Sequence, residues 1–331
     1  MKVLVTGAQG RVGSALVKTL VERGYSVRGL DLQPHDGKFD HAAYEYMQGD
    51  LLDSDSVAQA VKGVEAVAHI AGLIFFDDRQ AKHIVDINWR ATFELLEAMA
   101  WSGQKFTRFV YASSGQVYPE NPDALRFYNP VDENHPLRPV NYYGWAKQAS
   151  ESMIWFYQRK WGIPGVSLRF THVQYPEELV DPHSQWSGPR FFVNARLASL
   201  ERMPVKSDLA QETIRLLKAA AKDDEQLLLS CAPDGLPNEM NISHPQDIAD
   251  AAVLALEKDA AVGEAYNVGH GDPFNFGEMI PYMADKLNMP YVRLNLPLGS
   301  YHGLTSNAKA RAQLGYAPKY GPRDLIDAAV G

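Results

Sequence analysis

The sequence predicts an α/β protein built on a doubly wound parallel sheet, with a smaller, discontinuous C-terminal lobe. Two observations lead to this fold class. Short apolar runs alternate with amphipathic helical patterns through residues 1–170, and such alternation implies right-handed βαβ crossovers and a parallel sheet. Beyond residue 170 the alternation ends and prolines interrupt the pattern, which indicates a second and less regular part of the chain.

The elements of the predicted sheet follow one another from the first residues. Strands are expected at 2–6, 26–30, 44–49, 64–70, 106–113 and 166–170, and helices at about 11–23, 80–101 and 142–161. A further helix and strand, at 242–256 and 264–269, resemble a return to the sheet. We therefore expect one domain to comprise residues 1–170 together with 242–269.

The remaining residues, 171–241 and 270–331, form the predicted lobe. Within it only 191–202 and 209–222 have a clear helical pattern, and prolines separate short helices after residue 274. Open α/β sheets bind ligands at the carboxyl edge of their strands. We therefore expect the lobe to cover that edge and to bind the substrate.

The composition excludes several classes of function. The 331 residues carry a formal net charge of −8 without clustered Lys or Arg, so neither nucleic acid nor an anionic membrane is an expected partner. The single cysteine, Cys231, allows no internal disulfide. His172, His183 and His302 follow no ligand spacing, so no metal is expected. No charged-then-apolar leader and no apolar run of about 18–20 residues is present, so the chain is expected to be cytoplasmic.

A glycine-rich turn joins the first predicted strand to the first helix. Residues 6–13 read Thr-Gly-Ala-Gln-Gly-Arg-Val-Gly. Glycine permits a tight turn, close approach of the backbone to a pyrophosphate and close packing of helix on strand, while the positive end of the helix faces the phosphates. The turn therefore predicts a dinucleotide-binding (Rossmann) domain. Cofactor contacts are expected from Gly7, Gln9, Gly10, Arg11, Val12 and Gly13.

The end of the second strand indicates which dinucleotide is bound. A carboxylate at Asp31 accepts hydrogen bonds from the ribose hydroxyls and repels a 2′-phosphate. NAD is therefore favoured over NADP, although Arg11 and Arg28 are nearby cations that would reverse the preference if they faced the ribose. Further cofactor contacts are expected from Asp50 and Leu51 after the third strand, and from Ala71 and Gly72 after the fourth. His69, which precedes them, is expected to be a core histidine.

The reactive centre is predicted at the start of helix 142–161. Tyr143 and Lys147 are four residues apart, which places them on one face of the helix. Tyrosine is a poor base at neutral pH, but a neighbouring ammonium and an oxidised nicotinamide lower its pKa. A reduction of about three pH units takes roughly 4 kcal/mol. We expect Tyr143 to take the proton of a substrate hydroxyl as hydride leaves the same carbon, and to return it in reverse. Tyr142 has no lysine at this spacing.

The end of the fifth strand supplies the third catalytic residue. Ser114 lies at the sheet edge where ligands bind, in the run Ser113-Ser114-Gly115-Gln116. A hydroxyl at this place is able to hydrogen-bond the reacting oxygen and hold it near Tyr143. Ser113 and Gln116 are candidate substrate contacts.

These motifs resemble the extended branch of the short-chain dehydrogenase/reductase family, the NAD-dependent epimerases/dehydratases. The resemblance covers essentially the whole chain, and its motifs are residues 6–13, 31, 50–51, 69–72, 88, 112–118, 143–147 and 168–170, with weaker support from 247–251, 265–269 and 314–316. It implies a bound NAD(P) and the catalytic set Ser114, Tyr143 and Lys147, with Lys147 also contacting the nicotinamide ribose. It also suggests a homodimer that pairs helices 80–101 and 142–161 of two subunits in a four-helix bundle.

The sequence departs from that family where nucleotide sugars are bound. His172 stands where such members usually carry asparagine, Met240 lies near the place of an arginine for the diphosphate, and residues 299–303 replace a further Arg-x-Gly-Asp-like run. Arg190 or Arg196 would be able to substitute for these anion contacts. His172 and Arg190 are therefore also candidate substrate residues.

Three functions are compatible with these motifs. The leading expectation is an NAD-dependent oxidoreductase with exchangeable cofactor, which transfers hydride between nicotinamide and a secondary hydroxyl or ketone of a small sugar-like substrate. The alternative is a nucleotide-sugar epimerase that keeps its NAD bound. A dehydratase is a weaker variant because Gly115 and Gln116 offer no carboxylate beside the serine. A non-enzymatic NAD sensor would be expected to lack Tyr143 or Lys147, and both are present.

Overall fold

The chain divides into two compact units. The structure is a computed structural model, and it describes residues 1–74, 77–119, 126–203, 206–299 and 303–331. Unit 1 comprises Met1–Val173, Pro245–Gly269 and Thr305–Ala317, and unit 2 comprises Gln174–His244, His270–Leu304 and Pro318–Gly331.

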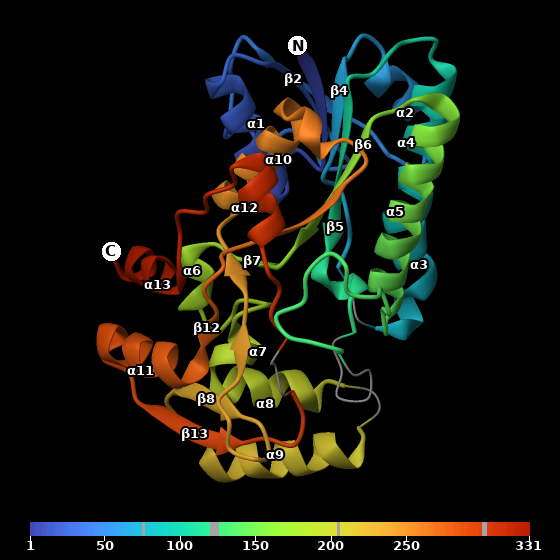
Figure 1. The fold of residues 1–331 in the computed structure, drawn as a ribbon. Helices are drawn as coiled ribbons and strands as arrows, with labels where there is room; N and C mark the ends of the chain where they lie inside the picture. Colours follow the sequence, from blue (N-terminus) through green and yellow to red (C-terminus); the bar gives the residue numbers. More distant parts are fainter. Residues whose placement is uncertain (75–76, 120–125, 204–205, 300–302) are drawn as a thin grey trace. The chain divides into compact units, whose positions relative to one another are not determined.

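Unit 1 contains a parallel sheet whose strands alternate with helices along the chain (Figure 1). Within the described residues the sheet has seven strands, in the order β11-β6-β5-β4-β1-β2-β3. They are β1 (Lys2–Thr6), β2 (Ser26–Asp31), β3 (Tyr44–Gln48), β4 (Ala66–His69), β5 (Arg108–Ser114), β6 (Gly165–Phe170) and β11 (Ala265–Val268). Every neighbouring pair is parallel. The strand order reverses between β1 and β4, where doubly wound sheets bind their ligands, and the predicted fold class is confirmed.

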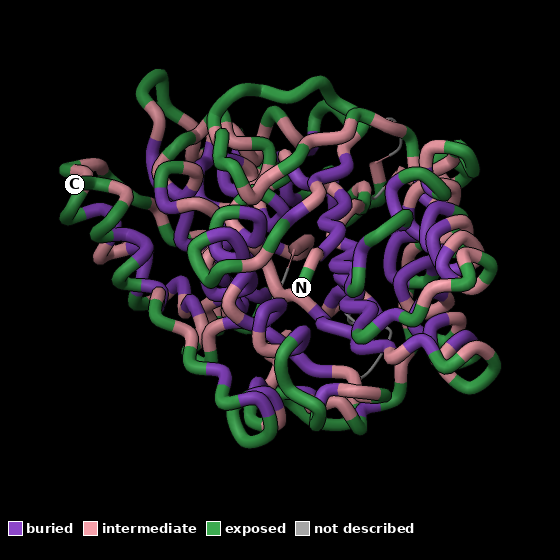
Figure 2. Tube along the Cα trace, turned by 90° about the horizontal axis from the view of Figure 1, so that it is seen from above, coloured by how far each residue is buried: buried purple, intermediate pink, exposed green. Residues whose placement is uncertain are grey.

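Helices cover both faces of this sheet. On one face lie α1 (Arg11–Glu22), α10 (Pro245–Glu257) and α12 (Ala308–Leu314), and on the other lie α2 (Ser54–Val61), α4 (Ala91–Trp101) and α5 (Tyr142–Trp161). Side chains of β1 alternate between the two layers, so Val3 and Val5 join the first apolar cluster and Leu4 joins the second. β4 and β5 are buried along their whole lengths; Figure 2 colours the trace by burial, with buried residues in purple.

The structure refines the predicted elements of unit 1. Helix 142–161 coincides with α5, whereas helix 80–101 is a composite of η1 (Asp78–Gln80), α3 (Ala81–Val85), the π-helical η2 (Asp86–Arg90) and α4. The sequence did not predict α2, whose N-cap is Asp53. The helix expected from residue 242 begins at Pro245, a residue type that suits a first helical position because it lacks an N–H.

Residues 305–317 belong to unit 1, although the sequence placed them in the substrate lobe. Ala310, Leu314 and Tyr316 are buried in the same apolar cluster as Tyr266 of β11. The segment therefore completes the layer over the last strand of the sheet. In the part of the chain that the structure describes, no helix has the length and apolar character needed to cross a membrane.

Unit 2 consists of shorter elements around an apolar cluster of its own. Its helices are α6 (Pro176–Leu179), α7 (Gly188–Phe191), α8 (Val193–Glu201), α9 (Asp208–Ala220), α11 (Phe276–Leu287) and α13 (Pro322–Val330). Its strands are β8 (Leu227–Cys231), β9 (Glu239–Met240), β10 (Ile242–Ser243), β12 (Phe274–Asn275) and β13 (Tyr291–Asn295). Phe191, Phe274 and Phe276 contact one another in its core. Pro281 lies inside α11, where the sequence had predicted an interruption.

Candidate active site

The glycine-rich turn is packed so closely that its glycines have no room for a side chain. Gly7 has a φ of +67°, and a Cβ there would lie 2.8 Å from the Cα of Ala71. A Cβ on Gly13 would lie 1.9 Å from the carbonyl oxygen of Gly7. The exposed Gly10 caps α1 without a side-chain hydrogen bond, so the first N–H groups of this helix face outward as an anion-binding group. The turn therefore fits the diphosphate of a dinucleotide.

Asp31 is held at the end of β2 by backbone N–H groups. Its carboxylate accepts from the N–H of Gln9 at 3.0 Å and from that of Gln33 at 3.2 Å. The Gln9 side chain in turn donates to the carbonyl of Pro34 at 2.5 Å and accepts from the N–H of Asp36 at 2.7 Å. Gln9 thus anchors the loop after β2 beside the predicted ribose site, a role that the glycine spacing gave no reason to expect.

The other predicted cofactor residues surround this turn. Arg11 donates to the carbonyl of Val173 at 3.2 Å, and Val12 is buried in the apolar cluster of α1. Asp50 is exposed and accepts from the N–H of Leu52 at 2.9 Å. The half-buried Leu51 packs against the second apolar cluster of unit 1. Arg28 is committed elsewhere, because it pairs with Glu45 and donates to carbonyls near the end of α2.

Lys147 lies buried between β5, α5 and the loop after β4. Its Nζ donates to the carbonyl of Ala112 at 2.8 Å and lies 4.9 Å from the ring centre of Tyr111 and 5.7 Å from that of Tyr143. A Cβ on the exposed Gly72 would lie 3.0 Å from this Nζ. The predicted cofactor residue Gly72 and Lys147 are therefore neighbours, and a side chain at position 72 would press against the Lys147 Nζ.

Ser114 and Tyr143 meet at the end of β5. Their side chains are hydrogen-bonded, and the Ser114 hydroxyl also accepts from the N–H of Gln116 at 3.2 Å. Tyr143 is 6% exposed and Ser114 is 8% exposed, so both groups sit at the rim of the core. The structure thus brings Ser114, Tyr143 and Lys147 together from β5 and α5.

Burial shifts both titrating groups of this pair. Desolvation raises the pKa of Tyr143 to about 12, against the opposing effect of the Ser114 hydrogen bond. Desolvation also lowers the pKa of Lys147 to about 7, against the opposing charge of Glu151. The sequence had predicted a lowered tyrosine pKa. Without the cofactor, burial therefore raises the tyrosine pKa. The lowered pKa expected from the sequence includes the charge of an oxidised nicotinamide, and it stays a prediction.

The start of α5 is fixed against the Ser114 turn by residues that the sequence analysis did not single out. Asn141 caps α5 by accepting from the N–H of Gly144 at 2.8 Å, and it donates to the side chain of Gln116 at 2.8 Å. A Cβ on Gly144 would lie 2.2 Å from the carbonyl oxygen of Gln116. An asparagine directly before a helix and a glycine in its first turn were the available signals.

Asn88 holds the loop after β4 from the π-helical segment η2. Its side-chain amide donates to the carbonyls of Leu73 and Ile84 at 2.8 and 2.9 Å. Its carbonyl accepts from Ser150 at 3.0 Å and from Tyr111 at 3.4 Å. Ser150 and Tyr111 lie on α5 and β5, so Asn88 ties three elements together behind Lys147.

The remaining predicted residues lie in different places. His69 is a core histidine as expected, hydrogen-bonded to Thr6 at 2.7 Å and Thr92 at 3.1 Å, and burial lowers its pKa to about 3. Ser113 is 1% exposed and donates to Glu151 at 2.6 Å. His172 lies in β7 (His172–Val173), at the end of the first chain segment of unit 1, whereas Arg190 lies in α7 of unit 2. Residues 300–302, including His302, lie outside the described residues.

Together these features define a class of protein. A glycine turn fitted to a diphosphate, a carboxylate for the ribose and a buried Ser–Tyr–Lys set are the parts of an NAD-dependent enzyme that moves hydride at a carbon bearing oxygen. Residues 3–269 match the profile of the NAD dependent epimerase/dehydratase family. The chain belongs to this family, an extended short-chain dehydrogenase/reductase group, and its cofactor is NAD.

Comparisons with individual proteins agree with this membership. The chain is 27% identical over 346 residues to a UDP-glucose 4-epimerase of Streptococcus mutans, covering 99% of this chain and 95% of that protein. It is 34% identical to a uronate dehydrogenase of Pseudomonas syringae over 174 residues, 51% of this chain and 58% of that protein. A solved short-chain dehydrogenase/reductase superfamily protein from Agrobacterium tumefaciens, with bound NAD, has a TM-score of 0.90 at 32% identity, covering 100% of this chain and 96% of that chain.

Proposed function

We propose that this protein is an NAD-dependent epimerase that inverts a hydroxyl-bearing carbon of a nucleotide sugar, and that it keeps its NAD bound. The observation that carries the proposal is the meeting of Ser114, Tyr143 and Lys147 beside Gly72. The epimerase relative from Streptococcus mutans, which matches nearly the full length of both chains, favours epimerisation over net oxidation. This reverses the order of the two functions expected from the sequence.

Each residue of the set has a defined task in this reaction. When bound, NAD would supply the nicotinamide that accepts hydride from the carbinol carbon and donates it back, and inversion requires the ketone to present its opposite face before the hydride returns. Tyr143 holds the proton of the substrate hydroxyl at its Oη, taking it as the ketone forms and returning it as the alcohol re-forms. Ser114 orients the same oxygen through its hydroxyl. Lys147 provides the positive charge that favours the tyrosine phenolate.

The residues that would hold NAD come from four loops of unit 1. Gly7, Gly10 and Gly13 would receive the diphosphate, and Asp31 the adenine ribose, with Gln9 keeping that carboxylate and its loop in place. Asp50 and Leu51 would border the adenine. Ala71, Gly72 and Lys147 would border the nicotinamide ribose, because Lys147 Nζ lies next to the position of a Cβ at Gly72.

A second function, an NAD-dependent dehydrogenase of a sugar or sugar acid, is favoured by one observation. Met240 lies at or near the position where a diphosphate-binding arginine was expected, and it is 2% exposed in the apolar core of unit 2. This position therefore offers no cation for a nucleotide diphosphate. The partial match to a uronate dehydrogenase agrees with this second function. In unit 1, His172 and Gln116 remain proposed substrate contacts in either case; Arg190 of unit 2 remains a separate candidate.

The two functions differ in what happens to NAD. An epimerase should release about one NAD per chain when the purified, dialysed protein is denatured, and should convert UDP-glucose without added cofactor. The matched control is Tyr143→Phe, which should contain the same NAD and convert nothing. If the purified protein carries no NAD, binds NAD reversibly and reduces it with a sugar acid, the epimerase proposal is wrong and the dehydrogenase is supported.

We also propose that the protein is a homodimer that pairs α4 and α5 with the same helices of a second copy. These helices expose five large aromatic side chains, Phe93, Trp101, Tyr142, Trp145 and Phe156. Trp101 contacts Trp161 edge-on at 4.9 Å between ring centres. Exposed aromatic groups of this size are typical of interfaces.

A further inference from the structure

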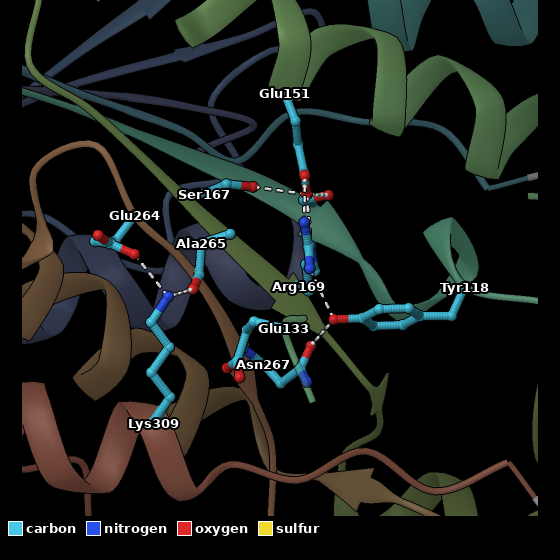
Figure 3. Close-up of polar contacts among 10 residues, drawn as sticks. Tyr118, Glu133, Glu151, Ser167, Arg169, Glu264, Ala265, Asn267 and Lys309 are labelled. Atoms are coloured by element: carbon cyan, nitrogen blue, oxygen red, sulfur yellow. Dashed lines mark hydrogen bonds and ion pairs between the residues drawn. The ribbon is translucent and has the colours of Figure 1, made fainter. Parts of the chain in front are cut away.

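A buried polar network lies behind the proposed catalytic residues, centred on the carboxylate of Glu151 (Figure 3). Glu151 is 2% exposed and follows Lys147 by four residues on α5, so the two side chains share a face, with about 5–6 Å between their Cβ atoms. Its Oε1 accepts from Ser113 at 2.6 Å, from Ser167 at 2.9 Å and from Arg169 Nε at 3.0 Å. Its Oε2 accepts from Arg169 Nη2 at 2.7 Å.

The network holds both ends of the turn that carries Ser114. Ser113, the residue before Ser114, donates directly to Glu151. Tyr118, the residue after the 3-10 turn Gly115–Val117, accepts from Arg169 Nη1 at 2.7 Å and donates to Asn267 of β11 at 2.9 Å. The ion pair between Glu151 and Arg169 therefore fixes the Ser114 turn relative to α5, the helix that carries Tyr143 and Lys147.

The charges around Lys147 give Glu151 a second role. The groups that face the ammonium are Tyr143 and Glu151 on α5, Tyr111 on β5 and His69 on β4. Burial keeps His69 neutral and raises the pKa of Tyr111, so neither contributes a negative charge. Among these groups Glu151 supplies the negative charge that opposes loss of the lysine proton. Arg169 on β6 carries the opposite charge and pairs with Glu151 at 2.7 Å, so it offsets part of this effect.

We propose that Glu151 is a positioning residue for the hydride-transfer reaction, which aligns the Ser114 turn with α5 and provides the counter-charge of the Lys147 ammonium. The proposal rests on the proposed roles of Tyr143 and Lys147. A buried ion pair is weak support for stability, since replacing both partners by uncharged groups is often neutral. Its retention behind a catalytic set is therefore better explained by the alignment and charge that it provides.

The test measures the titration of Lys147 and Tyr143 in the NAD-loaded protein by carbon-13 NMR of labelled lysine and tyrosine. Lys147→Arg and Tyr143→Phe assign the two resonances. The variant is Glu151→Gln combined with Arg169→Met, which removes both charges and leaves no unpaired buried ion. Glu151→Gln alone would leave the buried guanidinium of Arg169 without its carboxylate partner and would destabilise the fold. The double variant avoids this effect. Circular dichroism and retained NAD establish that each variant is folded.

In the double variant the titration midpoint of Lys147 should fall by at least about half a pH unit, because the carboxylate that opposes loss of its proton is removed. Glu151→Asp, which keeps a negative charge beside Arg169, should have a Lys147 midpoint close to that of the wild type. The matched control removes the other ion pair of Figure 3, through Glu264→Gln with Lys309→Met, and should leave both midpoints unchanged. Unchanged midpoints in a folded, NAD-loaded double variant would overturn the proposal.

This readout needs no substrate, so it separates the proposal from the proposed function. If Tyr143→Phe retained turnover, the catalytic assignment would fail while the titration of Lys147 still reported on Glu151. If the midpoints did not move while Tyr143→Phe abolished turnover, Glu151 would be structural and the catalytic assignment would stand.

Discussion

Tyr143 and Lys147 lie in surroundings that favour the neutral form of each. Burial raises the pKa of the phenol to about 12 and lowers the pKa of the ammonium to about 7. For Tyr143 to accept a proton near neutral pH, the site therefore needs a further positive charge. An oxidised nicotinamide carries one. The pair is thus arranged to become reactive when the cofactor is in its oxidised form.

Replacing the phenol tests the role of Tyr143. Tyr143→Phe should reduce kcat by about a hundredfold to ten-thousandfold, the usual contribution of a positioned acid/base, because only the titrating oxygen is lost. NAD content should stay within about twofold of the wild type. Turnover is measured with the substrate identified in the epimerase assay. Substantial activity in this variant would show that another group moves the proton.

Replacing the ammonium tests what burial does to stability. Lys147 has its pKa lowered from 10.5 to about 7 by burial, so the unfolded chain binds the proton more tightly between these values. The buried lysine therefore lowers the free energy of unfolding, fully below about pH 7 and no longer once the pH reaches 10.5. The upper bound of this destabilisation is roughly 5 kcal/mol, at about 1.4 kcal/mol per pH unit. Lys147→Met should therefore be inactive yet melt a few degrees higher at pH 6.5, an advantage that shrinks by pH 10.

The control for this measurement is Lys160→Met on the same helix. Lys160 is exposed, so its loss should produce no difference in melting temperature that depends on pH in this way. A wild-type protein that melts above Lys147→Met at pH 6.5 would contradict the account of a destabilising buried ammonium.

The meeting of Ser114, Tyr143 and Lys147 could be predicted from the sequence, whereas their catalytic roles stay a prediction. Tyr143 and Lys147 are one helical turn apart, and Ser114 ends a strand at the edge where such sheets bind ligands. The contacts of Gln9 and Glu151 could not be predicted, because no spacing rule joins Gln9 to Pro34 or Ser113 to Glu151.

At the scale of elements, α5 packs closely against the Ser114 turn. This contact exists because position 144 is glycine, whose missing Cβ would lie 2.2 Å from the carbonyl oxygen of Gln116. The Asn141 cap and its bond to Gln116 hold the same junction.

A single methyl group should open this junction. Gly144→Ala should lower kcat at least about tenfold, since displacements near 1 Å at a reacting centre have large effects, while NAD content and helicity are retained. The matched control is Ser152→Ala on the exposed face of the same helix, which should be fully active. Wild-type activity in Gly144→Ala would show that the contact between α5 and the Ser114 turn tolerates an added methyl group.

The element boundaries show the limits of local patterns. β1 and α5 were predicted to the residue: β1 is a short apolar run that ends at the glycine turn, and α5 lies between its N-cap Asn141 and Gly162. The composite helix of residues 78–101 was not, because its π-helical segment is set by Asn88 bonding to the loop after β4. In unit 2, β8 and β13 were missed; they pair with each other across about sixty residues, and neither has a helix-and-strand rhythm around it.

At the scale of the whole molecule, the proposed dimer makes a clear prediction. Trp101→Glu combined with Phe156→Glu places charges on the exposed aromatic faces of α4 and α5, and should convert a dimer into a monomer because an unpaired charge in an apolar interface is unfavourable. Light scattering after gel filtration measures the mass. Leu236→Glu, at a similarly exposed leucine of unit 2, should leave the mass unchanged. A wild-type protein that is monomeric in solution would contradict the proposed dimer.

The path of the chain has a consequence for how the protein is made. Unit 1 takes strands β1 to β6 and helices α1 to α5 from the early part of the chain, but α10, β11 and α12 come from residues 245–314. Because β11 pairs directly with β6, the outer edge of β6 stays unpaired during synthesis until about a hundred further residues have been translated. Exposed strand edges invite wrong partners. The nascent chain therefore has its greatest need of chaperone protection while unit 2 is being translated.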